Sequence, residues 1–278
     1  MLFRRCVKSK GAKMRRILLF CSLFLFLISN YALTPLAQAE EVEKHVIEYV
    51  TQDKYVLRAN LSYPQVKKQK YPIAILLHSF GLSSEDWRTL PAELHQQGFA
   101  VLEIDFRGHG KSIYLTNMQQ RSHIHLGNDS LKQFPNDVYQ ILRQAFLTYD
   151  NISGSEILLV GADIGASAAI FVADALEQKP TAMVLISPQI EFKGLYTPVA
   201  LAEAGDIPIL GVITRKDLAA YKEIEVLQKY AQGSFSLLRL PEGGPGMTCL
   251  AVNDGAVSTL VTWLVQKTPS LNFAGALD

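Results

Sequence analysis

Short apolar runs alternate with amphipathic stretches along the chain from residue 43 onward. In residues 45–50 and 55–63 polar and apolar side chains alternate, and a short polar connection at Gln52 and Asp53 separates the two runs. A period of two is typical of a strand with one face in solvent, and a short connection joins antiparallel neighbours. We therefore predict an antiparallel hairpin at the edge of a sheet.

The runs that follow are of two kinds. Short, mainly apolar runs predict strands at residues 73–77, 100–104, 157–160, 182–186, 207–213 and 234–240. Helical spacing of apolar side chains predicts helices at residues 85–97, 138–146, 166–176, 221–230 and 257–265. Strands that alternate with helices form a mainly parallel sheet with helices on both faces, which places the chain in the α/β class.

The connections also limit how many domains the chain can form. Only the short segment 188–203 separates the strand at 182–186 from the next strand region, which leaves no room for a cap domain. Ligands of open α/β sheets bind at the carboxyl ends of the strands. We therefore expect one domain over residues 40–278, with an open, shallow cleft at that edge of the sheet.

Residues 1–39 differ from the rest in charge and hydropathy. They carry seven basic residues and no acidic one, and an apolar run from Ile17 to Ser29 precedes Ala37-Gln38-Ala39. This order is typical of a secretory signal peptide, here cleaved after Ala39, and it predicts a periplasmic or secreted protein. The run is shorter than the roughly 20 residues that span a bilayer. An uncleaved segment that anchors the protein to the inner membrane is the alternative.

The remainder of the chain is mildly acidic. It carries 20 basic and 26 acidic residues, a net charge of −6, without basic clusters. This distribution argues against nucleic acid as a partner. Cys249 is the one cysteine left after cleavage, so an oxidising compartment poses no pairing problem.

Five segments carry a resemblance to a known family. They are His78 to Trp87, Asp105 to Ser112, Gly161 to Ala166, Leu185 to Pro188 and Phe192 to Leu195, and the first three directly follow predicted strands. Their order and spacing resemble the α/β-hydrolase superfamily, in particular capless bacterial esterase or lipase-like members akin to serine aminopeptidases and monoglyceride lipases. The resemblance implies an α/β-hydrolase fold over about residues 43–267.

Members of that superfamily hydrolyse esters with a serine, a histidine and an acid. The serine stands in a Gly-x-Ser-x-Gly turn between a strand and a helix. Here Gly161 and Gly165 match the glycines, but Asp163 stands at the serine position. Asp217 matches the acid, and Pro245 stands where the histidine belongs. The resemblance therefore implies a triad that is changed at two of its three positions.

The family also stabilises a developing negative charge with backbone N–H groups of a His-Gly-x-Gly loop. The matching segment here is His78-Ser79-Phe80-Gly81, with serine in place of the first glycine. We expect Phe80 and Ile164 to supply the N–H donors of this oxyanion hole. A carboxylate at residue 163 would repel an oxyanion beside it.

Three interpretations of Asp163 follow. In the first it caps the next helix, as acidic residues do at a positive helix end. In the second it is a nucleophile, as in dehalogenases and epoxide hydrolases, with His123 or His125 as the substitute base. A third alternative is a metal site made of Asp163, His123 and His125. For Asp217 without a histidine to orient, we expect either a cap on the next helix or an ion pair with Arg215 or Lys216 in solvent.

Loss of a triad member typically removes about three to six orders of magnitude of rate. We therefore predict an exported relative of esterases without Ser-His-Asp hydrolysis, which binds a small apolar ligand or a partner protein in its cleft and needs no cofactor or metal. The alternative is an atypical but active hydrolase that uses Asp163 with His123 or His125. A purely structural or assembly role is a third possibility.

Overall fold

The computed structural model describes residues 42–64 and 70–272 of the 278-residue chain. The predicted signal peptide, residues 1–39, lies outside the described residues. Among those that are described, no helix is long and apolar enough to cross a membrane.

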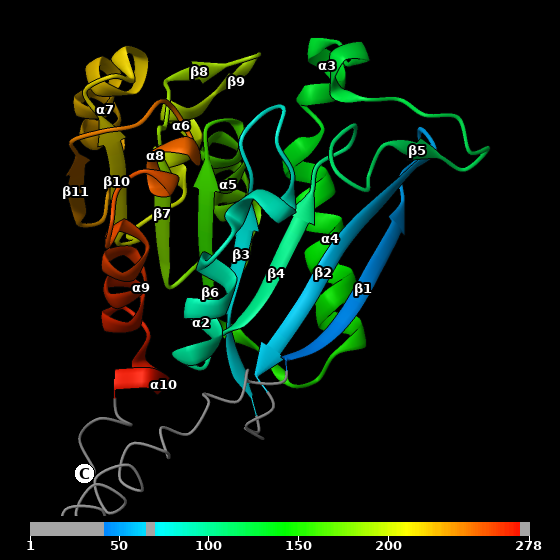
Figure 1. Ribbon diagram of the computed structural model, residues 1–278, viewed down its shortest axis with the longest axis horizontal. Coiled ribbons are helices and arrows are strands. Elements are labelled where there is room, and N and C mark those ends of the chain that lie inside the picture. Colours follow the sequence, from blue (N-terminus) through cyan, green and yellow to red (C-terminus); the bar gives the residue numbers. More distant parts are fainter. Residues whose placement is uncertain (1–41, 65–69, 273–278) are drawn as a thin grey trace, which may run out of the picture. The chain divides into compact units, whose positions relative to one another are not determined.

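A single large sheet forms the centre of the described unit (Figure 1). Its strands follow the spatial order β1-β2-β4-β3-β6-β7-β10-β11, and β5 pairs with β2. Strands β1, β2 and β4 pair antiparallel, and every pair from β4 to β11 is parallel. The strands are β1 (Val42–Val50), β2 (Tyr55–Pro64), β3 (Tyr71–Leu77), β4 (Ala100–Asp105), β5 (Tyr114–Leu115), β6 (Ile152–Ala162), β7 (Ala182–Ile186), β10 (Ile209–Thr214) and β11 (Phe235–Leu240).

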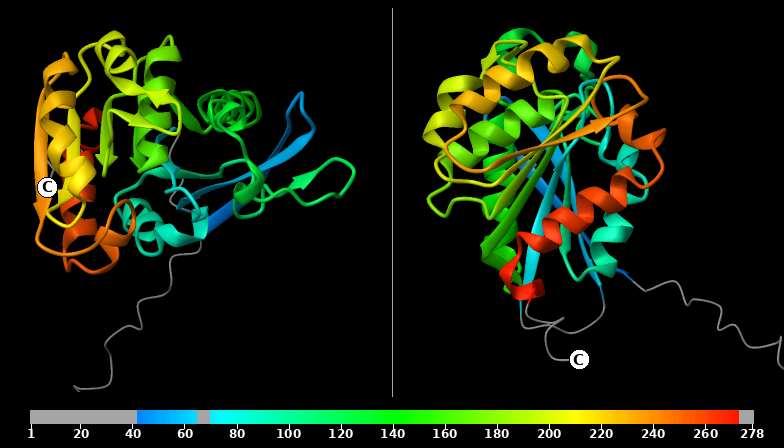
Figure 2. Two further views of the ribbon diagram at one scale, coloured as in Figure 1. Left: turned by 90° about the horizontal axis from the view of Figure 1, so that it is seen from above. Right: turned by 90° about the vertical axis from the view of Figure 1, so that its left-hand side faces the viewer.

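Helices cover both faces of this sheet (Figure 2). Helices α4, α5, α6 and α7 pack on one face, and α2 and α9 on the other. A separate hairpin is formed by β8 (Glu191–Phe192) and β9 (Leu195–Tyr196). The helices are η1 (Ser84–Trp87), α2 (Leu90–Gln96), η2 (His123–His125), α3 (Asn128–Leu131), α4 (Phe134–Thr148), α5 (Ile164–Ala175), α6 (Thr197–Glu203), α7 (Leu218–Tyr230), α8 (Thr248–Ala251), α9 (Ala256–Gln266) and α10 (Pro269–Asn272).

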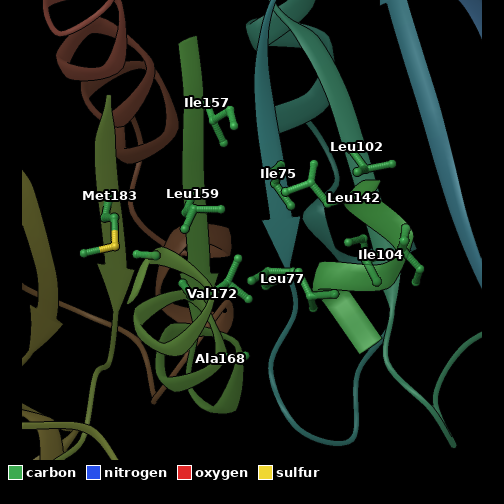
Figure 3. Packing of buried hydrophobic residues seen from close by; sticks show 14 of the residues in the cluster. Ile75, Leu77, Leu102, Ile104, Leu142, Ile157, Leu159, Ala168, Val172 and Met183 are labelled. Carbon is green, nitrogen blue, oxygen red and sulfur yellow. The ribbon is translucent and has the colours of Figure 1, made fainter. Parts of the chain in front are cut away.

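The core follows from the apolar runs of the central strands. Every residue of β3 and of β7 is buried, as expected for strands covered on both faces. In Figure 3, Ile75, Leu159 and Met183 from three strands lie beside Leu142 of α4 and Val172 of α5. This packing fixes the register of the strands, and therefore the position of the loops at their carboxyl ends.

The α/β prediction is confirmed, as are the edge hairpin, the mainly parallel sheet and the absence of a cap domain within the described residues. The prediction of one continuous helix over residues 85–97 is wrong. The chain forms η1 and α2 instead, because Arg88 between them has φ 53° and ψ −107°, which no helix accommodates. Pro91 then lies in the first turn of α2, where its missing N–H is harmless.

Candidate functional site

Asp163 lies on a sharp turn between β6 and α5. Its φ of 57° and ψ of −118° are strained for any residue with a side chain. The flanking glycines make the turn possible. A Cβ on Gly161 would lie 2.2 Å from the carbonyl oxygen of Gly165, and a Cβ on Gly165 would lie 2.0 Å from that of Leu77. The glycine pattern in the sequence therefore reflects close backbone packing around Asp163.

The carboxylate of Asp163 faces the loop that follows β3. The backbone N–H of Phe80 donates to Asp163 Oδ2 at 3.2 Å, and the adjacent backbone of Ile164 also favours the charged form of this carboxyl. The interpretation of Asp163 as a side-chain helix cap is wrong, because its carboxylate accepts no N–H from the second or third residue of α5, as a cap does. Asp163 has a left-handed φ, and its carboxylate bonds Phe80 in the neighbouring loop instead. Of the two N–H groups expected to form an oxyanion hole, that of Phe80 therefore binds the Asp163 carboxylate itself.

Burial raises the pKa of the Asp163 carboxyl from 3.8 to about 6. The hydrogen bonds from Phe80 and Ile164 act in the opposite direction, because they favour the charged form. The charge of Asp217 adds a smaller upward shift of this pKa, and Lys193 a smaller downward one. Asp163 therefore changes charge in a mildly acidic range.

Ser79, which stands at the first glycine of the family loop, has a structural role. Its Oγ accepts the N–H of Met247 at 3.0 Å, and its own N–H donates to Met247 Sδ at 3.4 Å. Beside it, a Cβ on Gly246 would lie 2.2 Å from Ser79 Oγ and 3.3 Å from Asp163 Cβ. The segment after β11 therefore packs directly against the Asp163 turn. The replacement of the family's glycine by Ser79 could be seen in the sequence, but nothing in the sequence indicated that Ser79 would contact Met247.

Asp217 begins α7, and its predicted capping role is confirmed. Its Oδ1 accepts the N–H of Ala220 at 3.2 Å, while its Oδ2 is buried and has no hydrogen-bond partner among the described residues. Pro245 is exposed, and its carbonyl accepts the hydroxyl of Thr248 at 2.7 Å. Burial, and to a smaller extent the charge of Asp217, raises the pKa of the nearby Cys249 thiol to about 12. Cys249 is therefore an inert thiol.

His123 and His125 lie in η2, which follows the long excursion after β4. The ring of His123 is 5.3 Å from the ring of Phe80 and stacks on His109 at 4.7 Å. His125 is exposed and shares a 3.3 Å hydrogen bond with Ser122. In the described part of the chain neither imidazole hydrogen-bonds Asp163. The interpretation as a metal site gains no support, because no three His, Cys, Asp or Glu side chains of the described residues come together to hold an ion.

Sequence reasoning missed Lys193, at the tip of the β8–β9 hairpin. Its ammonium group lies 4.6 Å from the centre of the Phe80 ring and 5.7 Å from that of Phe192. Lys193 and Gly194 both have positive φ, which makes the tight turn between the two short strands. The motif around residues 192–195 carried the resemblance, but nothing in it indicated that a cation would face the same aromatic ring as His123.

The remaining histidines of this region are structural. His78 Nδ1 bonds the carbonyl of Ser79 at 2.8 Å, and its Nε2 accepts the N–H of Phe106 at 3.1 Å. His109 Nδ1 bonds the carbonyl of Arg107 at 3.0 Å. Burial lowers the pKa of His78 to about 4 and that of His109 to about 3, so both rings are neutral near pH 7. They hold the loops after β3 and β4 and carry no charge to the site.

Comparison with known families gives one match. The sequence model described as serine aminopeptidase, S33, matches residues 68–229, which is more than half of the chain. The match includes Asp163 and Asp217 and ends before Pro245. No curated protein matches the chain at a significant level.

Many solved structures share the fold. A structure of DcsB in complex with its substrate analogue superposes with a TM-score of 0.64 at 14% identity, over 82% of this chain and 100% of that one. The dienelactone hydrolase of Anabaena variabilis has a TM-score of 0.58 at 20% identity, over 80% and 94%. The esterase domain of a Rhodothermus marinus protein has a TM-score of 0.56 at 18% identity, over 80% and 97%. At these identities the likeness establishes the α/β-hydrolase fold.

Proposed function

The chain belongs to the serine aminopeptidase S33 family of α/β hydrolases, and from this premise we propose that it is a member without ester or peptide hydrolysis that binds a ligand instead. In this proposal Asp163 replaces the nucleophilic serine, Pro245 replaces the histidine, and Asp217 is the acid that remains. The scaffold of an esterase is then used for recognition.

One observation carries the proposal: the Asp163 carboxylate accepts the N–H of Phe80, one of the two donors expected for an oxyanion hole. Hydrolysis of an ester by this family needs such donors for the oxygen of the tetrahedral intermediate. A resident carboxylate occupies the Phe80 donor and places a negative charge where the intermediate would develop its own. The same residue would have to be the nucleophile, so its two roles exclude each other.

The site also has no means to activate water. Pro245 has no side chain that takes or gives a proton, and the candidate base His123 packs against Phe80 rather than hydrogen-bonding Asp163. General base catalysis requires hydrogen-bond reach of the group that loses the proton. We expect ester turnover no faster than that of a variant without the carboxylate.

The proposal is tested with a chromogenic short-chain ester, p-nitrophenyl acetate, and the purified protein lacking residues 1–39. We expect the wild-type protein and Asp163→Ala to release nitrophenol at the same rate, close to the rate in buffer. Turnover by the wild-type protein that disappears in Asp163→Ala would overturn the proposal. Circular dichroism of both proteins establishes that the comparison is between folded molecules.

A second candidate function is an atypical hydrolase in which Asp163 attacks and His123 activates water. The position of His123 beside Phe80, 5.3 Å between ring centres, is the observation that favours it. This candidate predicts a covalent ester on Asp163 after incubation with a short alkyl halide or epoxide, detected by mass spectrometry of the intact protein. It further predicts that His123→Ala accumulates that ester, whereas our proposal predicts no adduct in either protein.

We also propose that the protein acts outside the cytoplasm, after removal of residues 1–39. The charged start, the apolar run and Ala37-Gln38-Ala39 support this. The mass of the protein recovered from the producing cells tests it, since cleavage leaves Glu40 as the first residue. A full-length mass in the membrane fraction would instead establish an uncleaved anchor.

A further inference from the structure

A polar cavity lies between the turn that joins β1 to β2 and the first part of α4, at the end of the sheet where α4 begins (Figure 1). Its volume is about 620 Å³, within the range of sites for small molecules. The lining comes from that turn, from Arg107 after β4 and from the segment that includes α3 and α4, and most of it is polar. No lining residue belongs to the Asp163 turn or to the loop after β3, so the cavity is separate from the candidate site.

A buried arginine fixes the two walls of this cavity to each other. Arg107 Nη1 donates to Asp53 Oδ2 in the turn at 2.7 Å, while its Nε and Nη2 donate to the two oxygens of Asp137 in α4 at 2.6 and 2.7 Å. The Thr51 hydroxyl also donates to Asp53 Oδ1 at 2.6 Å. Arg107 is 2% exposed and Asp137 is 1% exposed, so they brace the walls and offer little surface to a ligand. The cavity is therefore preformed, which spares a ligand the entropy of ordering its site.

Three amide side chains line the cavity on the α4 side. Gln133 directly precedes α4, and Asn136 and Gln140 follow at spacings of three and four residues, so the three lie on one face of the helix. Gln133 and Asn136 are exposed and Gln140 is partly exposed, and none of these side chains hydrogen-bonds another described residue. An amide both donates and accepts hydrogen bonds, as a hydroxyl does. The row of amides therefore complements a ligand that carries several hydroxyls.

An aromatic residue, Tyr49, lines the cavity on the side of the hairpin. It lies near the end of β1, on the same face of the strand as the buried Ile47, and packs partly against the core that α4 covers. The tyrosine ring offers an apolar surface to the C–H groups of a ligand. The cavity thus combines hydrogen-bonding groups on one wall with an apolar ring on the other.

The charges at the cavity disfavour an anion. Asp53 and Asp129 line it with exposed side chains. Among the described residues of the lining, Arg107 is the one cation, and it is already paired with Asp53 and with a buried acid of α4. Lys132 lies 3.7 Å from Asp129 but does not line the cavity. A negatively charged ligand would therefore meet repulsion without a cation to bind it.

We propose that this cavity binds an uncharged saccharide, whose hydroxyls bond the amides of Gln133, Asn136 and Gln140 and whose C–H face packs on the ring of Tyr49. A purely apolar molecule would remove water from the amides without replacing its hydrogen bonds. A sugar ring offers both hydroxyls at its edge and C–H groups on its face. This inference goes beyond the function proposed for the Asp163 site and does not depend on it.

NMR of the ¹⁵N-labelled protein tests the proposal directly, because each side-chain amide gives its own signals and alanine variants assign them. The probes are the methyl pyranosides of glucose, galactose and mannose, with glycerol, putrescine and the corresponding uronic acids for comparison. We expect at least one pyranoside to move the signals of Asn136 and Gln140, with a Kd of about one millimolar or tighter. Its uronic acid should bind at least about threefold more weakly, because of the carboxylates, and glycerol at least about tenfold more weakly.

Matched variants of α4 establish the location. Gln144 is exposed, lies one turn beyond Gln140 on the same helix and does not line the cavity. We expect Gln140→Ala to weaken binding of the best pyranoside about three- to tenfold, and Gln144→Ala to leave it unchanged. Asn136→Trp fills the cavity from an exposed position and should weaken binding at least about tenfold. Gln144→Trp adds the same ring outside the cavity and should have no effect.

Four results would overturn this inference: no pyranoside moves the amide signals, glycerol binds as tightly as the pyranosides, the variants of Gln144 weaken binding as much as those in the cavity, or putrescine binds more tightly than every pyranoside. The last result would identify an acidic surface for cations. Asp163→Ala should bind the pyranosides as the wild-type protein does. Failure of the function proposed for Asp163 is measured by ester turnover, so it is distinguishable from failure of the saccharide site.

Discussion

Asp163 and Asp217 hold equivalent positions in two strand–helix units of the same sheet, yet their carboxylates do opposite things. Each is the residue directly before the helix that follows its strand, α5 after β6 and α7 after β10. Asp217, with φ −86°, bonds the N–H of Ala220 in its own helix. Asp163, with φ 57°, bonds the N–H of Phe80 in a neighbouring loop. Backbone conformation, not residue type, decides which contact an acid makes here.

The neighbours explain the difference in backbone. Strand β6 pairs with β3, so the loop after β3 stands directly beside the Asp163 turn, and Gly165 lies against the carbonyl of Leu77. Strand β10 lies one strand from the sheet edge, and Asp217 after it has the negative φ of an ordinary helix cap. A strained turn thus persists only where the surrounding packing leaves no alternative.

The largest expected effect is a gain of ester hydrolysis when the two regions are made to work as one site. In the double variant Asp163→Ser and Pro245→His, the N–H group of Phe80 becomes free, and the unpartnered Oδ2 of Asp217 is available to orient an imidazole. We expect hydrolysis of p-nitrophenyl acetate at least about a thousandfold above the wild-type rate.

The single variant Asp163→Ser is the control for this gain. It frees the same donor but supplies no base, so its rate should stay within about tenfold of the wild type. A folded but inactive double variant would mean that residue 245 does not reach the turn, and that the exposed Pro245 marks a loop that has moved away from the family geometry.

The second effect is a loss of stability when the turn that carries Asp163 is disrupted and the region around Asp217 is left unchanged. Gly165→Ala would place a Cβ 2.0 Å from the Leu77 carbonyl, so β3 and α5 must separate. We expect the free energy of unfolding to fall by about 3 kcal/mol or more, measured by urea denaturation. Gly154→Ala is the matched control, because nothing lies within 4 Å of a Cβ there. A similar loss in both variants would contradict the close packing at Gly165.

The third effect is a change in stability when the charge of Asp163 is removed. The pKa of Asp163 is about 6 in the folded protein against 3.8 as its ordinary value. Between these values the folded state binds the proton more tightly than the unfolded state does, so the wild-type protein loses stability as the pH rises from 4 to 6. Asp163→Asn has no such loss. We expect it to be about 3 kcal/mol more stable at pH 7, with most of the difference gone at pH 4.

Urea titrations of the wild-type protein and Asp163→Asn at pH 4, 5, 6 and 7 measure this difference. Two buried histidines also affect the pH dependence, but they contribute equally to both proteins and cancel. The exposed Asp254→Asn is the control and should follow the wild type throughout. A stability difference that does not change with pH would mean that the gain of Asp163→Asn comes from packing and not from the charge.

The smallest effect is on the Asp217 side. Asp217→Ala removes the cap bond to Ala220, which typically costs about 1 kcal/mol. The substitution also removes the buried oxygen that has no partner in the described part of the chain, and this offsets part of the loss. We expect a decrease of less than about 1 kcal/mol in the free energy of unfolding. A decrease of 2 kcal/mol or more would indicate a partner for that oxygen, such as a bound water.

Much of the fold could be predicted because it depends on local patterns. The alternation in residues 45–63 predicted the edge hairpin, and the apolar runs predicted the central strands within a few residues. The exceptions are local conformations that the pattern does not encode. Arg88, with its positive φ, divides a stretch of unbroken helical spacing, and the two short strands around Lys193 are too brief to show a period.

The candidate site was predicted in its residues but not in its contacts. The elbow glycines located Asp163, and the resemblance of residues 78–81 to the family's oxyanion-hole loop implied that Phe80 lies near it. The direction of the Asp163 carboxylate was predicted wrongly, because the usual role of an acid at this position is a helix cap. The polar cavity beside α4 had no signal in the sequence, since the amides that line it fit the solvent-facing side of an amphipathic helix equally well.

By itself, the sequence determined an α/β fold with a glycine-flanked turn that carries Asp163, because strand periodicity, helical spacing and the positions of Gly161 and Gly165 are properties of neighbouring residues. The resemblance of its motifs to the α/β-hydrolase superfamily implied that Asp163 stands in place of a serine. The tertiary structure decided where the Asp163 carboxylate points and which polar side chains line the cavity beside α4. The N–H of Phe80 is 83 residues from Asp163, and Ser79 is 168 residues from Met247. Contacts over such separations follow from how the whole sheet packs, so local sequence patterns do not predict them.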